Sequence, residues 1–252
     1  MAKRNPADVA VFLIGGREVV GDLRSFDDSR EALIEPSETL GDTWGENSFV
    51  GVRTAKLSIE GFYDDRQGGI HDALSASADL TPVLVYGLAG STYGAEFVGW
   101  AGAKRKTYER QLSIGALTKV AAEFETNGPV DLVRQLWYYH IASTTGNTTG
   151  APVDNGVSTT GLAGYLQYGA TAGEANISII HSSDGVTWGT LINFTQTVKG
   201  VTTGSYAAER VVTTAVAERY LAMNITTATA TGAGTTAGLA FFVGAARNLT
   251  TG

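Results

Sequence analysis

The pattern of apolar and polar positions predicts short β-strands along nearly the whole chain. Residues 52–62 show it most clearly, because Leu57 and Ile59 alternate with Ser58 and Glu60. Further apolar runs in the first half end at glycine or polar turn residues, as strands do. They predict an N-terminal hairpin over residues 9–20 and strands over 82–88, 95–103, 106–126 (with a bend or break inside it) and 130–139.

The C-terminal half contains the same kind of short apolar run, separated by turn residues. Short strands at regular spacing are typical of a β-sandwich. The predicted strands cover residues 164–168, 176–181, 187–194, 209–214, 219–227 and 239–244.

One short helix is predicted near residues 66–78. Asp64 and Asp65 suit its start, and Ile70 and Leu74 follow at helical spacing. The predicted fold class is therefore all-β: a sandwich or barrel with one short flanking helix, followed by a second small β-sandwich.

Charge divides the chain near residue 140. Residues 1–140 carry 14 Lys and Arg and 20 Asp and Glu, whereas residues 141–252 carry only 4 and 5. We therefore predict a β domain over residues 1–142, a Thr/Gly-rich linker over 143–156 and an outer β-sandwich over 157–252. On this interpretation the first domain should assemble without the second.

Residues 25–50 have no apolar period and are predicted to be a long loop. A long structureless segment in a compact domain is usually functional or held by a partner. Trp44 and Phe49 are large aromatic residues that a solvent loop would not need, so they are predicted contact residues.

The amino-acid composition excludes some kinds of chemical site and disfavours some partners. The chain has no cysteine, which excludes disulfides and thiolate sites. Its net charge of −7 disfavours binding to the phosphate backbone of nucleic acids. The apolar run after the basic N-terminal residues is too short for a signal peptide or a membrane span.

Catalytic and metal-binding motifs are missing from the sequence. His71, His140 and His181 do not have metal-ligand spacing, and no phosphate-binding loop or nucleophile elbow occurs. The predicted protein is therefore not an enzyme and uses no cofactor or metal. Residues 182–188 approach an Asp-box, a carbohydrate-associated turn, but the sequence is one residue short of that pattern and an Asp-Gly turn between two strands explains it without sugar chemistry.

The order of these features resembles the major tail protein of tailed phages, the tail tube subunit. The residues that carry the resemblance are the N-terminal hairpin, the long segment 25–50, the stretch 57–64 (Leu-Ser-Ile-Glu-Gly-Phe-Tyr-Asp), the helix and the strands that follow. The second half resembles the β-sandwich domains added to phage tail proteins, through residues 164–167, 182–188, 218–221 and 240–244.

This resemblance implies a virion structural protein, made in the host cytoplasm, with no membrane partner. Subunits of this family form hexameric rings that stack into a tube and conduct DNA without specific binding. The implied partners are further copies, a tape measure protein and a tail terminator. Residues 25–50 would reach the next ring through Trp44 and Phe49, and the second half would decorate the outside.

An acidic channel wall would let DNA slide, because it repels phosphate. We expect Asp27, Asp28, Glu31 and Glu60 to face the lumen.

Two alternatives stay open at the level of the sequence. One is a carbohydrate- or cell-surface-binding protein, with Tyr165, Tyr168 and Trp188 as glycan contacts. The other is a tail-tip ring protein of the same fold.

Overall fold

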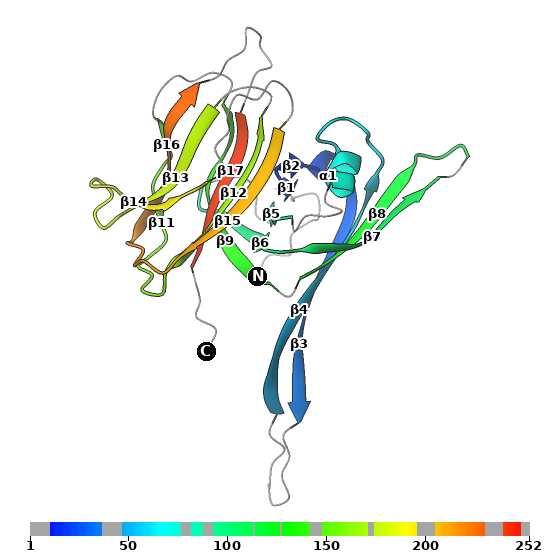
Figure 1. The fold of residues 1–252 in the computed structure, drawn as a ribbon, viewed down its shortest axis with the longest axis horizontal. Coiled ribbons are helices and arrows are strands. Elements are labelled where there is room, and N and C mark those ends of the chain that lie inside the picture. Colours follow the sequence, from blue (N-terminus) through cyan, green and yellow to red (C-terminus); the bar gives the residue numbers. More distant parts are fainter. Residues whose placement is uncertain are drawn as a thin grey trace, which may run out of the picture.

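The computed structural model describes residues 11–36, 47–76, 82–87, 93–112, 114–126, 128–141, 148–170, 174–195, 205–229 and 239–247. These residues form three antiparallel sheets, one short 3-10 helix, η2 (Val20–Asp22), and one α-helix, α1 (Ile70–Ala76). The predicted all-β class is confirmed (Figure 1).

The largest sheet, the central sheet, has eight strands in the order β15-β12-β17-β9-β6-β5-β1-β2. They are β1 (Val11–Ile14), β2 (Arg17–Glu18), β5 (Leu84–Gly87), β6 (Glu96–Trp100), β9 (Val130–Ile141), β12 (Leu162–Ala170), β15 (Ser205–Thr213) and β17 (Leu239–Arg247).

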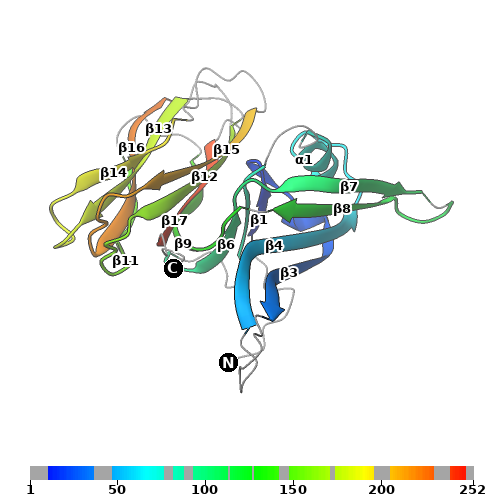
Figure 2. The ribbon, with the colours of Figure 1, turned by 60° about the horizontal axis from the view of Figure 1, so that its bottom comes forward.

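A four-stranded sheet, in the order β3-β4-β8-β7, lies against one part of the central sheet (Figure 2). Its strands are β3 (Leu23–Pro36), β4 (Asn47–Phe62), β7 (Lys104–Gln111) and β8 (Lys119–Thr126).

A third sheet lies against the other part of the central sheet. It contains β10 (Thr148–Thr149), β11 (Val153–Asp154), β13 (Glu174–Ser182), β14 (Gly189–Asn193) and β16 (Tyr220–Thr229), and both β10 and β11 pair with β16.

The central sheet is curled, and its two edges approach each other. Its inner side holds an apolar cluster that draws on both halves of the chain, including Leu13, Phe97, Tyr165 and Phe242. The buried Gln167 side chain on β12 spans the gap between the edges. It accepts a hydrogen bond from the backbone N–H of Gly16 at 2.5 Å and donates one to the carbonyl of Val83 at 2.7 Å.

Two further apolar clusters hold the other sheets in place. The first joins the four-stranded sheet and α1 to the central sheet, with Phe12, Leu57, Leu74, Trp100 and Phe124 fully buried. The second lies between the central sheet and the third sheet. Every sheet therefore has at least one face covered, which accounts for the apolar alternation of its strands.

The predicted division into two modules needs correction. Strand β9 of the first half pairs along its length with β17 of the second, so the central sheet runs through the expected boundary. Residues 148–154, expected in a linker, supply β10 and β11, and Val153 is buried. Both halves of the chain contribute strands and buried apolar residues to the central sheet, so they form one folded unit.

Two other predictions were wrong about connections. Residues 25–36 and 47–50 belong to strands β3 and β4, which pair from Leu23 with Gly61 to Pro36 with Asn47, so the predicted loop is a long hairpin. The predicted strand over residues 106–126 is also a hairpin, β7–β8. The helix is confirmed but shorter than predicted.

Candidate assembly surface

The four-stranded sheet has one covered face and one open face. Along β4, Leu57 and Ile59 point into the core while Lys56, Ser58 and Phe62 are exposed. Strand pairing extends this open face across the neighbouring strands, because side chains directly opposite each other share a face. We call it the outer face.

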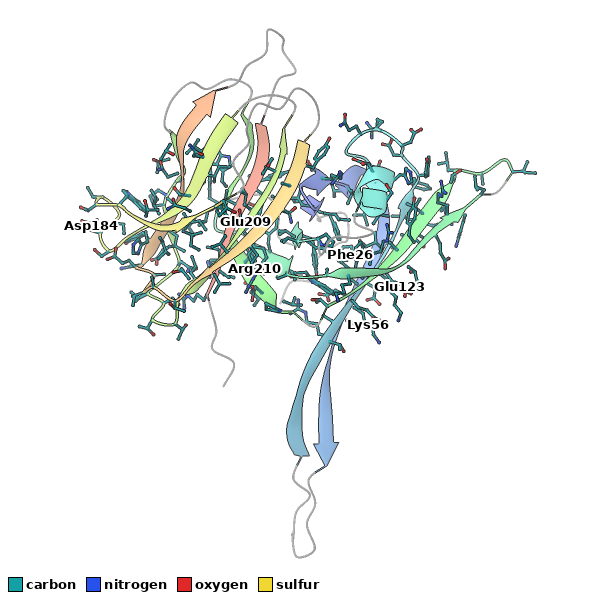
Figure 3. All side chains as sticks on the ribbon, in the orientation of Figure 1. Phe26, Lys56, Glu123, Asp184, Glu209 and Arg210 are labelled. Carbon is teal, nitrogen blue, oxygen red and sulfur yellow. The ribbon has the colours of Figure 1, made fainter. Side chains whose placement is uncertain are left out.

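Charged side chains of both signs occupy the outer face. Figure 3 shows two of them, Lys56 on β4 and Glu123 on β8. By strand pairing and contact, the set comprises the carboxylates Asp27, Glu60, Glu109, Glu123 and Glu125 and the amines Lys56, Lys104, Lys106 and Lys119. The face is thus close to neutral rather than strongly acidic.

Ion pairs engage Lys106 and Lys119 among these amines. Lys106 Nζ lies 2.8 Å from Glu125 Oε1, and Glu60 Oε1 lies 3.1 Å from Arg24 and 3.5 Å from Lys119. The hydrogen bond from Lys106 holds the pKa of Glu125 below its usual range and raises the pKa of Lys106.

The remaining carboxylates of the outer face have no such partner. Within the described ranges, Asp27, Glu109 and Glu123 make no ion pair. Lys104 makes no ion pair in these ranges either, so charges of both signs remain without an ion-pair partner on this face.

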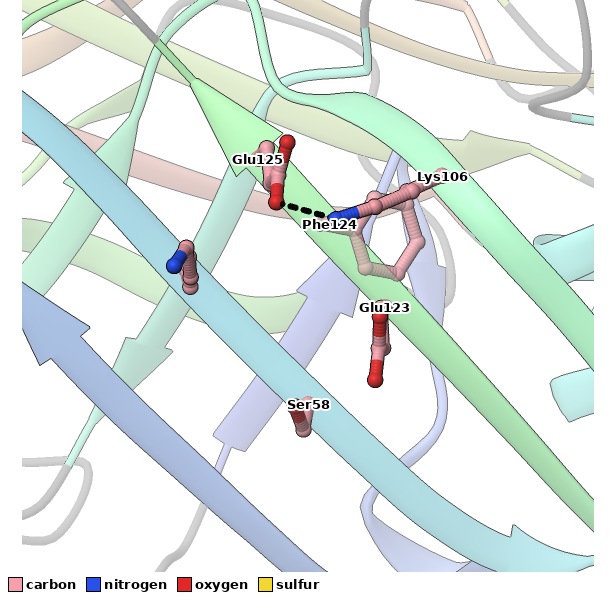
Figure 4. A pocket seen from close by; sticks show the side chains of 6 residues that line it. Ser58, Lys106, Glu123, Phe124 and Glu125 are labelled. Carbon is pink, nitrogen blue, oxygen red and sulfur yellow. Dashed lines mark hydrogen bonds and ion pairs between the residues drawn. The ribbon is translucent and has the colours of Figure 1, made fainter.

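A shallow hollow of about 220 Å³ lies between β4, β8 and β7 (Figure 4). Lys56, Ser58, Lys106, Glu123 and Glu125 line it, and the Lys106–Glu125 pair crosses it. It is small for a ligand site, since sites for small molecules are usually larger and mostly apolar. We assign it no ligand.

Both edges of the four-stranded sheet lack a strand partner in the described chain. Strand β3 pairs only with β4, and β7 pairs only with β8. An edge strand presents unpaired N–H and C=O groups and is a template for another strand. These are two long edges on one sheet.

The residues predicted to face a lumen do not all share one face. Asp27 and Glu60 lie on the outer face. The backbone of Glu31 pairs with Thr54, but its side chain is not described. Asp28 lies opposite Leu57 on the covered face, which corrects the prediction for this residue.

Asp28 makes structural contacts in the covered layer. It accepts a hydrogen bond from the hydroxyl of Tyr86 on β5 and one from Arg30 at 3.2 Å. Burial, together with the bond to Asp28, raises the pKa of Tyr86. Asp28 therefore links the four-stranded sheet to the central sheet.

The predicted inter-ring contact residues are only partly described. Trp44 lies outside the described residues. Phe49 belongs to β4 and pairs with Ile34 of β3, near the far end of the hairpin.

Two of the three predicted glycan contacts are buried. Tyr165 is 0% exposed, so its ring cannot serve as a surface platform, and Tyr168 is 6% exposed. The hydroxyl of Tyr165 donates to Asp131 at 2.5 Å, and Arg210 contacts both groups. Burial, reinforced by the charge of Asp131, raises the pKa of Tyr165.

The third, Trp188, is half-buried and follows the turn that resembles an Asp-box. Figure 3 shows Asp184 in this turn, at the end of the molecule away from the four-stranded sheet. Asp184 accepts hydrogen bonds from the backbone N–H groups of Val186 and Thr187, both 2.8 Å, which lower its pKa. The carboxylate is used within the turn.

The histidines have structural surroundings where they are described. His71 Nδ1 lies 2.5 Å from the Tyr108 hydroxyl, and His181 Nδ1 accepts the backbone N–H of Glu218. Across the described ranges no three His, Asp or Glu residues gather as a metal site would require. In the same ranges, no helix has the length and apolarity to cross a membrane.

One feature escaped the sequence reasoning. Leu112, Ile114 and Leu117 lie at the tip of the β7–β8 hairpin and are 80%, 109% and 71% exposed. The sequence predicts a strand over these positions, and that prediction does not indicate their exposure. The glycine at position 115, whose φ is +79°, signals the turn between them.

No protein-family model matches the chain, and no curated protein matches its sequence. Solved structures match at low identity. A chain in the virion of a native gene transfer agent particle is 17% identical with a TM-score of 0.43, over 52% of this chain and 98% of that chain. A chain in the tail of an empty gene transfer agent particle is 15% identical with a TM-score of 0.40, over 52% and 98%.

The Dit protein of phage SPP1, described as part of a hub adsorption apparatus in phages that infect Gram-positive hosts, is 11% identical. Its TM-score is 0.32, over 95% of this chain and 99% of that chain. With identities below 25% and TM-scores below 0.5, function has to be argued from the surfaces of this chain itself.

Proposed function

We propose that this chain is a structural subunit of a phage-type tail, in which copies join their four-stranded sheets edge to edge into a closed ring. The observation that carries the proposal is the pair of open edges, β3 and β7, on one sheet. Joining them satisfies the unpaired backbone groups of both strands.

The strand directions suit this joint. Each strand in the order β3-β4-β8-β7 is antiparallel to its neighbour, so β3 and β7 run in opposite directions. Rotation about a ring axis keeps the direction of each strand along that axis. β3 of one copy therefore meets β7 of the next in antiparallel orientation, and the contact is head-to-tail and can close.

The bulk of the molecule decides which face lines the ring. The central sheet and the third sheet lie on the covered side of the four-stranded sheet (Figure 2). This bulk fits on the outside of a ring but would collide on the inside. The outer face therefore surrounds the channel, and much of the C-terminal half decorates the exterior.

The wall of such a channel combines neutralised pairs with carboxylates that have no ion pair among the described residues. Asp27, Glu60 and Glu123 are the proposed lumen-facing acids, and the backbone register of Glu31 extends their row on β3. The lysines bound to Glu125 and Glu60 are less available to phosphate. DNA would pass this wall without being held.

From the resemblance to tail tube subunits we infer the larger assembly. Six copies would form a ring, and rings would stack into a tube that conducts DNA, with a tape measure protein and a tail terminator as partners. The β3–β4 hairpin, with Trp44 and Phe49, would then reach the neighbouring ring. No catalytic step is part of this function.

A cross-linking experiment tests the edge joint. The chain has no cysteine, so Ser29→Cys on β3 and Thr107→Cys on β7 introduce the only two thiols. Within one copy, these strands are three strand spacings apart, about 14 Å. A bis-maleimide with a reach of roughly 8 Å should therefore join different copies only, giving a ladder of covalent oligomers that ends at the ring size.

The matched controls are the two single-cysteine variants, which should give dimers at most. Monomers that do not cross-link at concentrations up to the millimolar range would contradict the proposal. A closed ladder without tubes in electron micrographs would keep the ring and favour a tail-tip ring protein over a tube subunit.

A further inference from the structure

The tip of the β7–β8 hairpin is an exposed apolar patch without a partner of its own in the described chain. Leu112, Ile114 and Leu117 form this patch, which we call the apolar cap. Three large aliphatic side chains exposed together on one projecting tip are unusual on a monomer and mark an interaction site. Figure 1 shows the hairpin extending away from the body of the molecule.

The cap and the β3–β4 hairpin leave the four-stranded sheet at opposite ends. At one end, Gln111 is level with Lys119, Lys119 with Phe62, and the neighbouring Gly61 with Leu23 at the start of β3. The cap lies just beyond this end. Strands β3 and β4 continue past the other end, where β8 stops at Thr126 opposite Ala55.

The two hairpins also differ in charge. Near the cap, residues 109–119 contain two basic residues, Arg110 and Lys119, and one acidic residue, Glu109. The basic residues 104–106 lie toward the other end of β7. Residues 31–52, which include the far part of the β3–β4 hairpin, contain five acidic residues and no lysine or arginine. Both segments also contain large apolar residues, such as Ile34 and Phe49 in the second.

We infer that the apolar cap of one copy packs against the β3–β4 hairpin of a second copy in the next ring. This inference rests on the proposed ring and adds the surface that receives the hairpin. Copies stacked in the same orientation bring the cap end of one sheet to the hairpin end of the next. The contact is head-to-tail, so it repeats along a tube.

The placement of the two hairpins at opposite ends of one sheet favours a second copy over an unrelated partner. The acidic residues of the second segment also complement the small positive excess beside the cap. Aliphatic side chains at the centre would provide the affinity, and the surrounding charges would fix orientation. A contact of this kind should weaken at high salt, since exposed charges are screened.

The first test compares assembly of the native chain with the triple variant L112T/I114T/L117T. All three residues are exposed, so folding should be unaffected, which circular dichroism verifies. The concentration needed for tubes should rise by about tenfold or more, while rings cross-linked through β3 and β7 still form. The control variant Val186→Thr removes an aliphatic side chain that is 80% exposed on a distant turn, and should assemble normally.

The second test locates the contact. Protein with Ile114→Cys is mixed with protein carrying Ser48→Cys on β4, and a short bis-maleimide is added. A mixed dimer should form above the assembly concentration, and Val186→Cys mixed with Ser48→Cys should give none.

The outcomes separate the two claims. Native protein that never assembles overturns both the ring and the cap contact. Normal tubes from the triple variant, or cross-links of Ile114→Cys only with itself, overturn the cap contact and leave the ring standing. Loss of tubes in the triple variant, together with formation of the mixed dimer in the second test, supports the cap contact.

Discussion

Gln167 shows at the scale of one residue how the curled sheet is held closed. Its amide is 1% exposed and is bonded to backbone groups that come from the other edge of the sheet. The carbonyl of Val83 also accepts a hydrogen bond from the N–H of Gly15 at 3.1 Å, whereas the described contacts give the N–H of Gly16 the Gln167 side chain as its acceptor. The amide therefore satisfies one backbone donor that would otherwise be buried without a hydrogen bond, and adds a second bond to the Val83 carbonyl.

Gln167→Leu should lower the free energy of unfolding by about 1–3 kcal/mol, because it leaves the N–H of Gly16 buried without an acceptor and one such group costs about 1–3 kcal/mol. Chemical denaturation measures the change. Gln111→Leu, at an exposed site, is the matched control and should stay within about 0.5 kcal/mol of the native chain. Equal stability of the two variants would show that the edges are not held through this residue.

Asp72 connects three elements through its contact with Arg17. Arg17 Nε donates to Asp72 Oδ2 at 2.8 Å, and its guanidinium lies 4.6 Å from the centre of the Tyr206 ring. Burial acts to raise the pKa of Asp72, but the hydrogen bonds from Arg17 and from the Gly68 N–H outweigh it. The net result is a pKa below the ordinary 3.8.

A carboxyl whose pKa is lowered by folding stabilises the folded state above its unfolded pKa and loses this contribution as pH falls through its folded pKa. Asp72→Asn should therefore be less stable than the native chain at pH 6, and the difference should shrink steadily below pH 4. Thermal unfolding between pH 2.5 and 6 measures it. The exposed Asp65→Asn is the control, and a difference independent of pH would contradict the account.

At the residue scale, sequence reasoning found the alternation of β4 but misplaced Asp28 and Tyr165. Asp28 lies on the covered face because it is adjacent to Asp27, and successive residues of a strand face opposite ways. A polar residue is normally expected on an exposed face, and the sequence does not reveal the hydrogen-bond partner of Asp28, Tyr86, which is 58 residues away. Tyr165 was predicted to be exposed for the same reason: Asp131 and Arg210 are close only in the fold.

At the scale of elements, the two hairpins of the four-stranded sheet explain the failed predictions of connections. The far parts of β3 and β4 continue past the end of β8 and pair with each other there. Alternation of apolar and polar residues reports a strand with one buried face, and strand pairing alone does not produce it. Residues 25–50 consequently resembled a loop, although much of this segment is paired strand.

Strand β9 is the element that ties the halves of the chain together. It lies between β6 of the first half and β17 of the second. Phe97 on β6 and Phe242 on β17 contact each other with ring centres 4.9 Å apart. The drop in charge after residue 140 marks a change of surface and not the end of a folding unit.

A chain ending at residue 142 should therefore not fold into a stable monomer, because β9 loses a partner strand and the inner cluster loses Tyr165 and Phe242. Size-exclusion chromatography and circular dichroism measure this. A chain ending at residue 247, which retains β17, is the control. A soluble, cooperatively unfolding 1–142 fragment would restore the prediction of independent domains.

At the scale of the whole molecule, the asymmetry of the four-stranded sheet is the basis of the proposed assembly. One face is covered by the rest of the chain and the other is open and charged, and neither edge has a strand partner among the described residues. Sequence reasoning reached the all-β class, but not the near balance of charge on the open face. Strand pairing between distant segments determines that balance.

Reversing two carboxylates tests the role of this face as a channel wall. Asp27→Lys with Glu123→Lys should leave rings intact and make the wall positive, because both side chains are exposed. Assemblies of the variant should retain DNA at low salt and release it as salt rises. Filter binding measures retention, and the matched control is Asp65→Lys with Glu218→Lys, away from the open face. Equal retention of DNA by both variants would show that the outer face does not line the channel.

Electron cryomicroscopy of the native chain at high concentration tests the central claim most directly. The account predicts closed rings in which β3 of each copy pairs with β7 of its neighbour and the outer face surrounds the channel. Particles that remain single copies, or rings joined through other surfaces with β3 and β7 free, would contradict it.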